Sequence, residues 1–139
     1  MASFSYLIQD ISELDLVAKQ ILELSQRHKI FLFDGKMGSG KTTLIKKVVH
    51  LLGVFESSSP TFSIINTYLG YNNQSIYHID CYRIENENEV ENIGLLEILN
   101  DQKLCFIEWP NKIHNFLPDT FVSVSISFDN NLRKITIES

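Results

Sequence analysis

The N-terminal part of the chain changes from an alternating pattern to a helical one. Residues 3–8 predict a short strand, and residues 12–28 predict a helix. Ser12 and Asp15 have the spacing of a capping box at the start of this helix. The apolar residues that fall mostly on one face of the predicted helix are Leu14, Val17, Ala18, Ile21, Leu22 and Leu24.

A wholly apolar run is followed by a glycine-rich turn and a second helical pattern. Residues 30–33 predict a strand that is buried on both faces of a parallel sheet. After the turn, apolar residues recur at helical spacing from Leu44 to Leu52. Gly53 then stands where a glycine commonly ends a helix. The segment therefore predicts a strand, a loop and a helix.

The remaining pattern predicts two hairpins that flank a helix and a strand. Residues 62–70 and 75–82 are rich in β-forming residues and are separated by a turn at 71–74. Residues 85–101 begin polar and continue in helical register.

Residues 103–109 predict another buried strand, and residues 122–128 alternate apolar positions with serines. Residues 129–131 turn the chain, and apolar alternation then returns. We find no linker or internal repeat, so residues 1–139 predict one α/β domain. Its central sheet is expected to be mixed and mainly parallel, with a C-terminal antiparallel hairpin.

The glycine-rich turn matches the phosphate-binding pattern G-x-x-x-x-G-K-[ST] from Gly35 to Thr42. Glycines allow the backbone to curl so that successive N–H groups point at a phosphate, and the helix N-terminus also favours an anion. Lys41 can reach the β- and γ-phosphates, and Thr42 offers a hydroxyl to Mg²⁺. The context of a buried strand and an amphipathic helix predicts a P-loop NTPase-like three-layer fold. The expected contacts to a nucleoside triphosphate come from Gly35, Met37, Gly38, Ser39, Gly40, Lys41, Thr42 and Thr43.

A carboxylate at the end of a neighbouring apolar strand commonly completes such a magnesium site. Glu108 follows four apolar residues and is our candidate, with Thr42, for the metal site. The alternative for Glu108 is a structural surface carboxylate. Asp80 ends a second apolar run and could act as a base, orient a water or stand behind the metal ligands. The sequence leaves these three roles open.

Composition limits the choice of partners. The net charge is −5, and the three arginines (Arg27, Arg83 and Arg133) are scattered, which argues against a protein that grips a nucleic acid by itself. The two cysteines are expected to be buried free thiols. No segment predicts a signal peptide or a membrane span, so we expect a cytoplasmic protein with no membrane partner.

Three further motifs follow the loop in order: S-P-T-F at 59–62, H-x-D-x-Y-R at 78–83 and I-E-W-P at 107–110. Together with the loop they resemble the TsaE family (formerly YjeE), bacterial P-loop ATPases of tRNA modification. The resemblance implies an ATP- and Mg²⁺-dependent subunit that supports formation of N6-threonylcarbamoyladenosine at position 37 of tRNAs reading codons that start with A. It implies TsaD and TsaB as partners, with tRNA reached only through their complex.

The resemblance also implies roles for individual residues. Thr61 would lie near the attacking water with Asp80, and Trp109 would form a wall of the nucleotide site. Lys41, Asp80, Glu108 and Thr61 are thus the expected catalytic residues. The roles of His78 and Arg83 stay open. Because no arginine finger is evident, we expect slow hydrolysis by the isolated chain, completed or stimulated by partners.

Two other functions fit a phosphate-binding loop less well. A small phosphotransferase (kinase) would need a lid with arginines, and no lid-length insertion is present. A GTPase-type switch would need a guanine-reading N-K-x-D motif. The chain has N-K-I-H at 111–114, where His114 replaces the acidic residue. ATP is therefore the favoured nucleotide.

Overall fold

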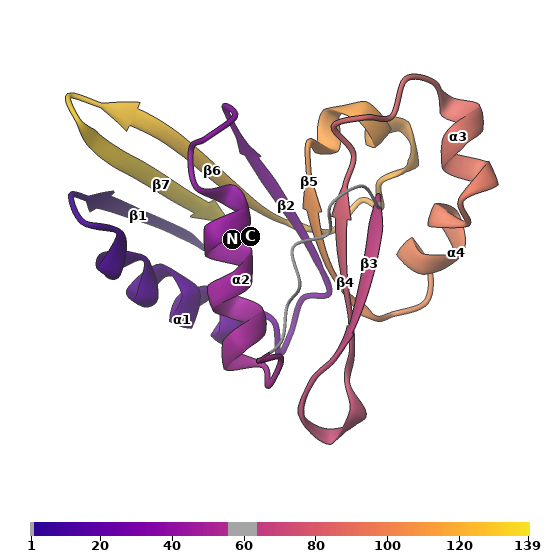
Figure 1. Ribbon diagram of the computed structural model, residues 1–139, viewed down its shortest axis with the longest axis horizontal. Coiled ribbons are helices and arrows are strands. Elements are labelled where there is room, and N and C mark those ends of the chain that lie inside the picture. Colours follow the sequence, from indigo (N-terminus) through magenta and orange to yellow (C-terminus); the bar gives the residue numbers. More distant parts are fainter. Residues whose placement is uncertain (1, 56–63) are drawn as a thin grey trace.

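The computed structural model describes residues 2–55 and 64–139. Within these residues one sheet has the strand order β1-β7-β6-β2-β5-β4-β3 (Figure 1). Its strands are β1 Ser3–Ile8, β2 Ile30–Gly35, β3 Ile65–Leu69, β4 Ser75–Asp80, β5 Leu104–Glu108, β6 Val122–Asp129 and β7 Leu132–Glu138.

The four central strands, β6, β2, β5 and β4, are parallel to their neighbours. At the two sides of this core, β3 pairs with β4, β7 pairs with β6, and β1 pairs with β7, each in antiparallel fashion. The prediction of a mixed sheet with a parallel centre and a C-terminal hairpin is confirmed. So is the hairpin at residues 65–80, whose turn is the 3₁₀ segment Tyr71–Asn73.

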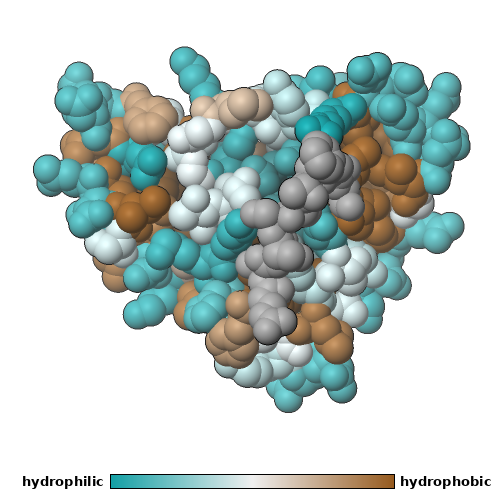
Figure 2. Space-filling view, in the orientation of Figure 1, coloured by the Kyte–Doolittle hydropathy of each residue, from teal (hydrophilic) through white to brown (hydrophobic). Residues whose placement is uncertain are grey.

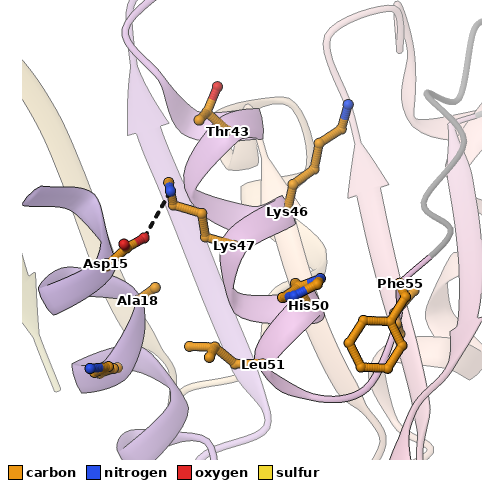
Figure 3. A pocket seen from close by; sticks show the side chains of 10 residues that line it. Asp15, Ala18, Thr43, Lys46, Lys47, His50, Leu51 and Phe55 are labelled. Carbon is orange, nitrogen blue, oxygen red and sulfur yellow. Dashed lines mark hydrogen bonds and ion pairs between the residues drawn. The ribbon is translucent and has the colours of Figure 1, made fainter. Parts of the chain in front are cut away.

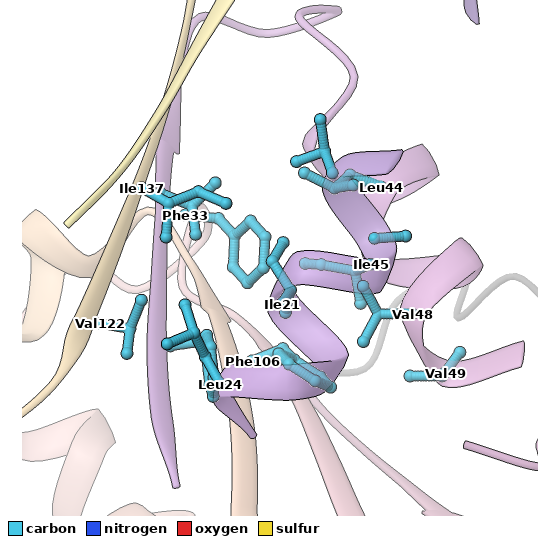
Figure 4. Close-up of a cluster of buried hydrophobic side chains, with 14 of the residues drawn as sticks. Ile21, Leu24, Phe33, Leu44, Ile45, Val48, Val49, Phe106, Val122 and Ile137 are labelled. Carbon is cyan, nitrogen blue, oxygen red and sulfur yellow. The ribbon is translucent and has the colours of Figure 1, made fainter. Parts of the chain in front are cut away.

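Helices cover both faces of the sheet, as a three-layer fold requires (Figure 1). Helices α1 (Leu14–Leu24) and α2 (Lys41–Leu51) pack on one face, where Phe31, Phe33 and Phe106 are fully buried. Figure 4 shows side chains of α1 and α2 meeting those of the sheet in this cluster. Helices α3 (Glu87–Asn92) and α4 (Leu95–Leu99) pack on the other face, together with the 3₁₀ segment Pro110–Phe116.

The first four residues of β2 are all apolar because the strand is covered on both faces. Phe31 and Phe33 point to the cluster with α1 and α2, whereas Ile30 and Leu32 belong to the cluster with α3 and α4. Alternate side chains of a strand point to opposite faces, so a strand covered on both faces is apolar at every position. The prediction of a doubly buried strand is confirmed.

Two helix predictions were wrong in detail. The first helix is shorter than 12–28, because a 3₁₀ turn (Ile11–Glu13) contains Ser12 and α1 begins only at Leu14, without a side-chain cap. The expected capping box of Ser12 therefore does not form.

The segment predicted as one helix over 85–101 is divided by Gly94, whose φ of 76° ends α3 and precedes α4. Its start carries a capping box that the sequence analysis missed. The Asn86 side chain accepts from the Glu89 backbone N–H, and the Glu89 carboxylate accepts from the Asn86 backbone N–H.

Helix α2 ends at Gly53 in the way that the position of this glycine in the sequence predicted. Gly53 has a φ of 101°, its N–H donates to the His50 carbonyl, and the Val54 N–H donates to the Val49 carbonyl. These are the two hydrogen bonds of a Schellman motif.

On the face in Figure 2, hydrophilic residues occupy most of the outline and hydrophobic ones gather in separate patches. None of the helices in the described ranges is both long and apolar enough to cross a membrane.

Candidate functional site

The carboxyl ends of the parallel strands meet at one edge of the sheet, and the glycine-rich loop lies there. Strand register sets Phe33 of β2 beside Glu108 of β5, and Glu108 beside Asp80 of β4. The loop leaves β2 at Gly35 and enters α2 at Lys41. The two carboxylates expected from the sequence therefore lie at the same edge as the loop, where ligands bind in open α/β sheets.

Two glycines of the loop adopt backbone angles that other residues seldom take. Gly38 and Gly40 have φ values of 79° and 110°. At Gly35 the limit is space, because an added Cβ would lie 2.8 Å from the backbone carbonyl of Ile126. The loop also buries Ser39, whose hydroxyl has no hydrogen-bond partner among the described residues.

Lys41 lies beneath the loop and is almost fully buried, with 4% of its surface exposed. Its Nζ donates to the Gly35 carbonyl at 2.5 Å and lies 3.7 Å from the centre of the Trp109 ring. Burial lowers the pKa of the Lys41 ammonium, while the negative charges of Glu108, Asp34 and Asp80 oppose that lowering. A phosphate oxygen could therefore replace the Gly35 carbonyl as the hydrogen-bond acceptor of the Lys41 ammonium.

Trp109 reaches Lys41 because its own backbone is in the left-handed region, with a φ of 57°. Such a φ is rare for a bulky residue. The ring also lies 5.0 Å from the ring of Tyr82. The two aromatic rings lie together beside the loop and line the same cavity.

Two side chains from different elements contact one carboxylate, that of Glu108. Both oxygens of Glu108 accept from the Thr42 hydroxyl, at 3.0 and 3.1 Å, although the two residues are 66 positions apart. His78 Nε2, from β4, lies 2.6 Å from Glu108 Oε2. Only 3% of the surface of either His78 or Glu108 is exposed. Glu108 is therefore no ordinary surface carboxylate, and it is held by the Thr42 hydroxyl from α2 and by His78 from the neighbouring strand β4.

A cavity of about 300 Å³ opens above these groups. The following expected site residues line it: Met37, Gly38, Gly40, Lys41, Thr42, Thr43, Asp80, Glu108 and Trp109. Gly35 and Ser39 instead border a neighbouring cavity, and Trp109 stands between the two. Thr61 lies outside the described residues.

Asp80 sits at the rim of the first cavity, and its Oδ1 accepts from the Tyr82 backbone N–H at 3.1 Å. Two further residues line this cavity that the sequence analysis did not name as site residues, namely Tyr82 and Arg133. Tyr82 belongs to the H-x-D-x-Y-R motif and could have been found there. Arg133 belongs to none of the sequence motifs. It lies at the cavity because β7 pairs with β6.

The arrangement suits Mg²⁺ bound together with a phosphate. Thr42 and Glu108 supply a hydroxyl and a carboxylate, which are the oxygen ligands that Mg²⁺ prefers. In the described part of the chain no group of three or more His, Cys, Asp or Glu residues could hold a metal by itself. The remaining ligands would come from the phosphates and water, as is usual for Mg²⁺ at such loops.

A larger cavity, of about 620 Å³, lies elsewhere, between α1 and α2. Figure 3 shows Lys46, Lys47, His50 and Phe55 along it, with Lys47 paired to Asp15 at 2.8 Å. It contains none of the loop glycines and neither carboxylate from the ends of β4 and β5. We therefore place the candidate site in the smaller cavity.

Comparison with known proteins gives consistent results. Residues 8–135 match the profile of a family described as "Threonylcarbamoyl adenosine biosynthesis protein TsaE". Among solved structures, the crystal structure of Bacillus subtilis YdiB superposes with a TM-score of 0.78 at 26% sequence identity. The superposition covers 98% of this chain and 84% of that one.

Curated proteins that resemble the chain carry one name, tRNA threonylcarbamoyladenosine biosynthesis protein TsaE. The protein from Borreliella burgdorferi is 43% identical over 91 residues, or 65% of this chain and 66% of that protein. The one from Haemophilus influenzae is 30% identical over 122 residues, covering 86% of this chain and 77% of its own. The one from Bacillus subtilis is 33% identical over 118 residues, covering 82% and 71%.

Proposed function

This chain belongs to the TsaE family, and from that premise we propose that it is a single-domain, Mg²⁺-dependent ATPase subunit for threonylcarbamoyladenosine formation in tRNA. It would act in the cytoplasm with TsaD and TsaB at position 37 of tRNAs reading codons that start with A, and contact tRNA only through that complex. The observation that carries the proposal is the Thr42–Glu108 contact beneath the loop. It brings a P-loop hydroxyl and a strand-end carboxylate together where a metal–phosphate group would bind.

In this mechanism the loop binds the phosphates. Phosphate oxygens would accept hydrogen bonds from backbone N–H groups at the start of α2 and from the Lys41 ammonium. Lys41 would give up its hydrogen bond to the Gly35 carbonyl to make this contact. Thr42 and Glu108 would hold Mg²⁺, which neutralises phosphate charge during transfer to water. His78 keeps the Glu108 carboxylate turned toward Thr42.

Hydrolysis by the chain alone is expected to be slow. Glu108 is hydrogen-bonded to Thr42 and His78, and Asp80 Oδ1 is bonded to the Tyr82 N–H. Asp80, with Thr61, is our candidate for the residues near the attacking water. A partner that reorients Asp80 or Thr61 would complete the site.

The central experiment measures Mg·ATP hydrolysis by the chain alone and with TsaB and TsaD added. Slow turnover that rises with the pair is expected, because the partners would complete the site. A rate that is indifferent to the pair would remove the proposed coupling. The next step would then be to screen hydroxyl-bearing phosphate acceptors, as for a phosphotransferase.

Lys41→Ala tests the nucleotide site itself. We expect calorimetric titration with Mg·ATP to show no measurable binding, because the buried ammonium would be lost from the phosphates. Lys47→Ala is the matched control, since it removes a lysine of the same helix whose ion pair with Asp15 is exposed. Unchanged affinity in Lys41→Ala would rule out the site assignment.

Glu108→Ala tests the metal role. The variant should bind ATP with a weakened dependence on Mg²⁺, because one of the two protein oxygens beside the metal is gone. The measurement is a Mg²⁺ titration at fixed ATP. A normal metal titration would exclude Glu108 from the metal site.

A further inference from the structure

We propose that the groove between α1 and α2 is a docking surface for an acidic amphipathic helix of a partner protein. This inference rests on the proposed function and extends it, because that function requires partners and assigns no surface of this chain to them. The groove is the cavity of about 620 Å³ that contains none of the loop glycines.

Both walls of the groove belong to helices whose inner faces are buried against the sheet. On α1, Asp15 and Lys19 are four positions apart and therefore lie one above the other on one face of the helix. On α2, Lys46 and His50 have the same spacing. The groove thus runs between two ridges of long polar side chains.

Positive charge dominates the rim of the groove. The basic side chains that line it are Lys19, Lys46, Lys47 and His50, and the carboxylate among its described lining residues is that of Asp15. Lys47 Nζ lies 2.8 Å from Asp15 Oδ1, so these two charges compensate each other. Figure 3 shows Lys47 turned toward Asp15 and Lys46 pointing away from it. The rim therefore keeps an excess of positive charge although the chain as a whole carries −5.

Exposed apolar side chains lie at the end of the groove beyond α2. Leu51 and Phe55 line it and are 37% and 61% exposed. The centre of the Phe55 ring lies 4.8 Å from that of His50 and 6.2 Å from that of Tyr71, which is itself 59% exposed. Exposed apolar side chains that gather beside a charged rim are typical of a protein–protein contact.

This combination of charge and apolar surface fits a protein helix better than a nucleic acid. A groove between two packed helices accepts a third helix, whose apolar face would cover Leu51 and Phe55 while its acidic residues meet the basic rim. A nucleic acid would be repelled by the Asp15 carboxylate and would need parallel ring faces for its bases. The rings of Phe55 and His50 instead stand at 87° to each other.

The groove adjoins the candidate nucleotide site through one residue. Thr43 lines both cavities, and α2 runs from Lys41 at the loop to Leu51 in the groove. A helix docked in the groove would therefore contact the same element that carries Lys41 and Thr42. Such a contact would let a partner act on phosphate binding without entering the candidate site.

The test measures binding of the chain to the TsaB–TsaD pair by biolayer interferometry. Phe55→Ala should weaken binding by about 10-fold or more, the loss that a central apolar anchor typically causes. Lys19→Glu should weaken it by about 3- to 30-fold at low salt and by less at high salt, because charges at a solvated rim are screened. The matched controls Phe121→Ala and Lys134→Glu, both at exposed positions outside the groove, should bind as the unmodified chain does.

Cross-linking and a parallel measurement of tRNA binding identify the occupant. Zero-length carbodiimide coupling should join the Lys19 amine to an Asp or Glu side chain in a helix of the pair, and coupling only to carboxylates outside a helix, or none, would overturn the proposal. So would a loss of tRNA binding with unchanged binding to the pair, because the occupant would then be a nucleic acid.

Unchanged affinity of either groove variant for the pair would also overturn the proposal, because the occupant would then not be both apolar and acidic. Thermal melts establish that each variant is folded. Leu51→Ala replaces Phe55→Ala if the latter does not fold.

The outcome is distinguishable from a failure of the proposed function. If the unmodified chain does not bind the TsaB–TsaD pair, the proposed partnership itself is refuted. If the unmodified chain binds and the groove variants bind equally well, only the docking surface is refuted.

Discussion

Replacing His78 by phenylalanine would isolate the contact that holds the candidate metal carboxylate. The imidazole Nε2 lies 2.6 Å from Glu108 Oε2, and both residues are 3% exposed. Phenylalanine keeps a ring on β4 but cannot donate to the carboxylate. Glu108 would then remain buried with Thr42 as its one hydrogen-bond partner among the described side chains.

The expected cost follows from the burial of the carboxylate. A hydrogen bond to a charged group contributes about 1.5–3 kcal/mol to the free energy of unfolding, and removing one partner also leaves the other desolvated. For a chain of this size that loss lowers the melting temperature by roughly 5–15 °C. Since phenylalanine also changes the packing, the single variant does not isolate the contact.

A double-mutant cycle with Glu108→Leu removes this ambiguity. Leucine at position 108 eliminates the carboxylate, and its effect on the Thr42 hydroxyl is present in both backgrounds and cancels. We expect the His78→Phe/Glu108→Leu variant to be more stable than the sum of the single losses predicts, by about 1.5–3 kcal/mol, because no buried carboxylate or imidazole is left unpaired.

The assay is urea unfolding of the ligand-free chain followed by far-ultraviolet circular dichroism, which requires no nucleotide or metal. Costs that add to within about 0.5 kcal/mol would show that the two side chains do not interact energetically. That result would refute the view that His78 positions Glu108.

Two other predictions concern the thiols and the loop. Burial raises the pKa of Cys81 and of Cys105 to about 12 from an ordinary value of 9.0, so both folded thiols stay protonated while unfolded ones ionise. Stability should therefore fall as the pH rises from about 9 toward 12, and a thiol reagent should label neither cysteine before unfolding; labelling of the folded chain near pH 8 would contradict this. Gly35→Ala should prevent Mg·ATP binding, because its Cβ would lie 2.8 Å from the Ile126 backbone carbonyl, which cannot move freely. At Gly38 an added Cβ would have no atom within 4 Å, but the backbone φ of 79° disfavours a side chain. Gly38→Ala should therefore cost only about 1 kcal/mol of stability, as measured by urea unfolding. If the two substitutions weakened Mg·ATP binding equally, the steric argument for Gly35 would be refuted.

The parts of the fold that the sequence predicted well are those in which local pattern and tertiary packing agree. The apolar run at Ile30–Phe33 and the glycine pattern that follows it define β2, the loop and the start of α2. The break at Gly94 was missed because apolar residues continue in register on both sides of it. Helical periodicity alone does not reveal a left-handed glycine within such a pattern.

The site was predictable where its residues lie in motifs and not where they meet through sheet pairing. Glu108 and Asp80 could be placed at one edge because both end apolar runs that parallel strands bring together. Arg133 could not, because its position depends on β6 pairing with β2 and on the tight turn into β7. Strand order is set by long-range contacts that alternation along the chain does not encode.

The position of Trp109 makes the site observable without any label. It is the one tryptophan of the chain, and its ring lies against the Lys41 ammonium at 3.7 Å. Tryptophan emission from the entire protein therefore originates from the lining of the candidate site. If Lys41 leaves the ring to bind a phosphate, as proposed, the surroundings of this single fluorophore would change. The light that the protein emits would then report directly whether the candidate site is filled.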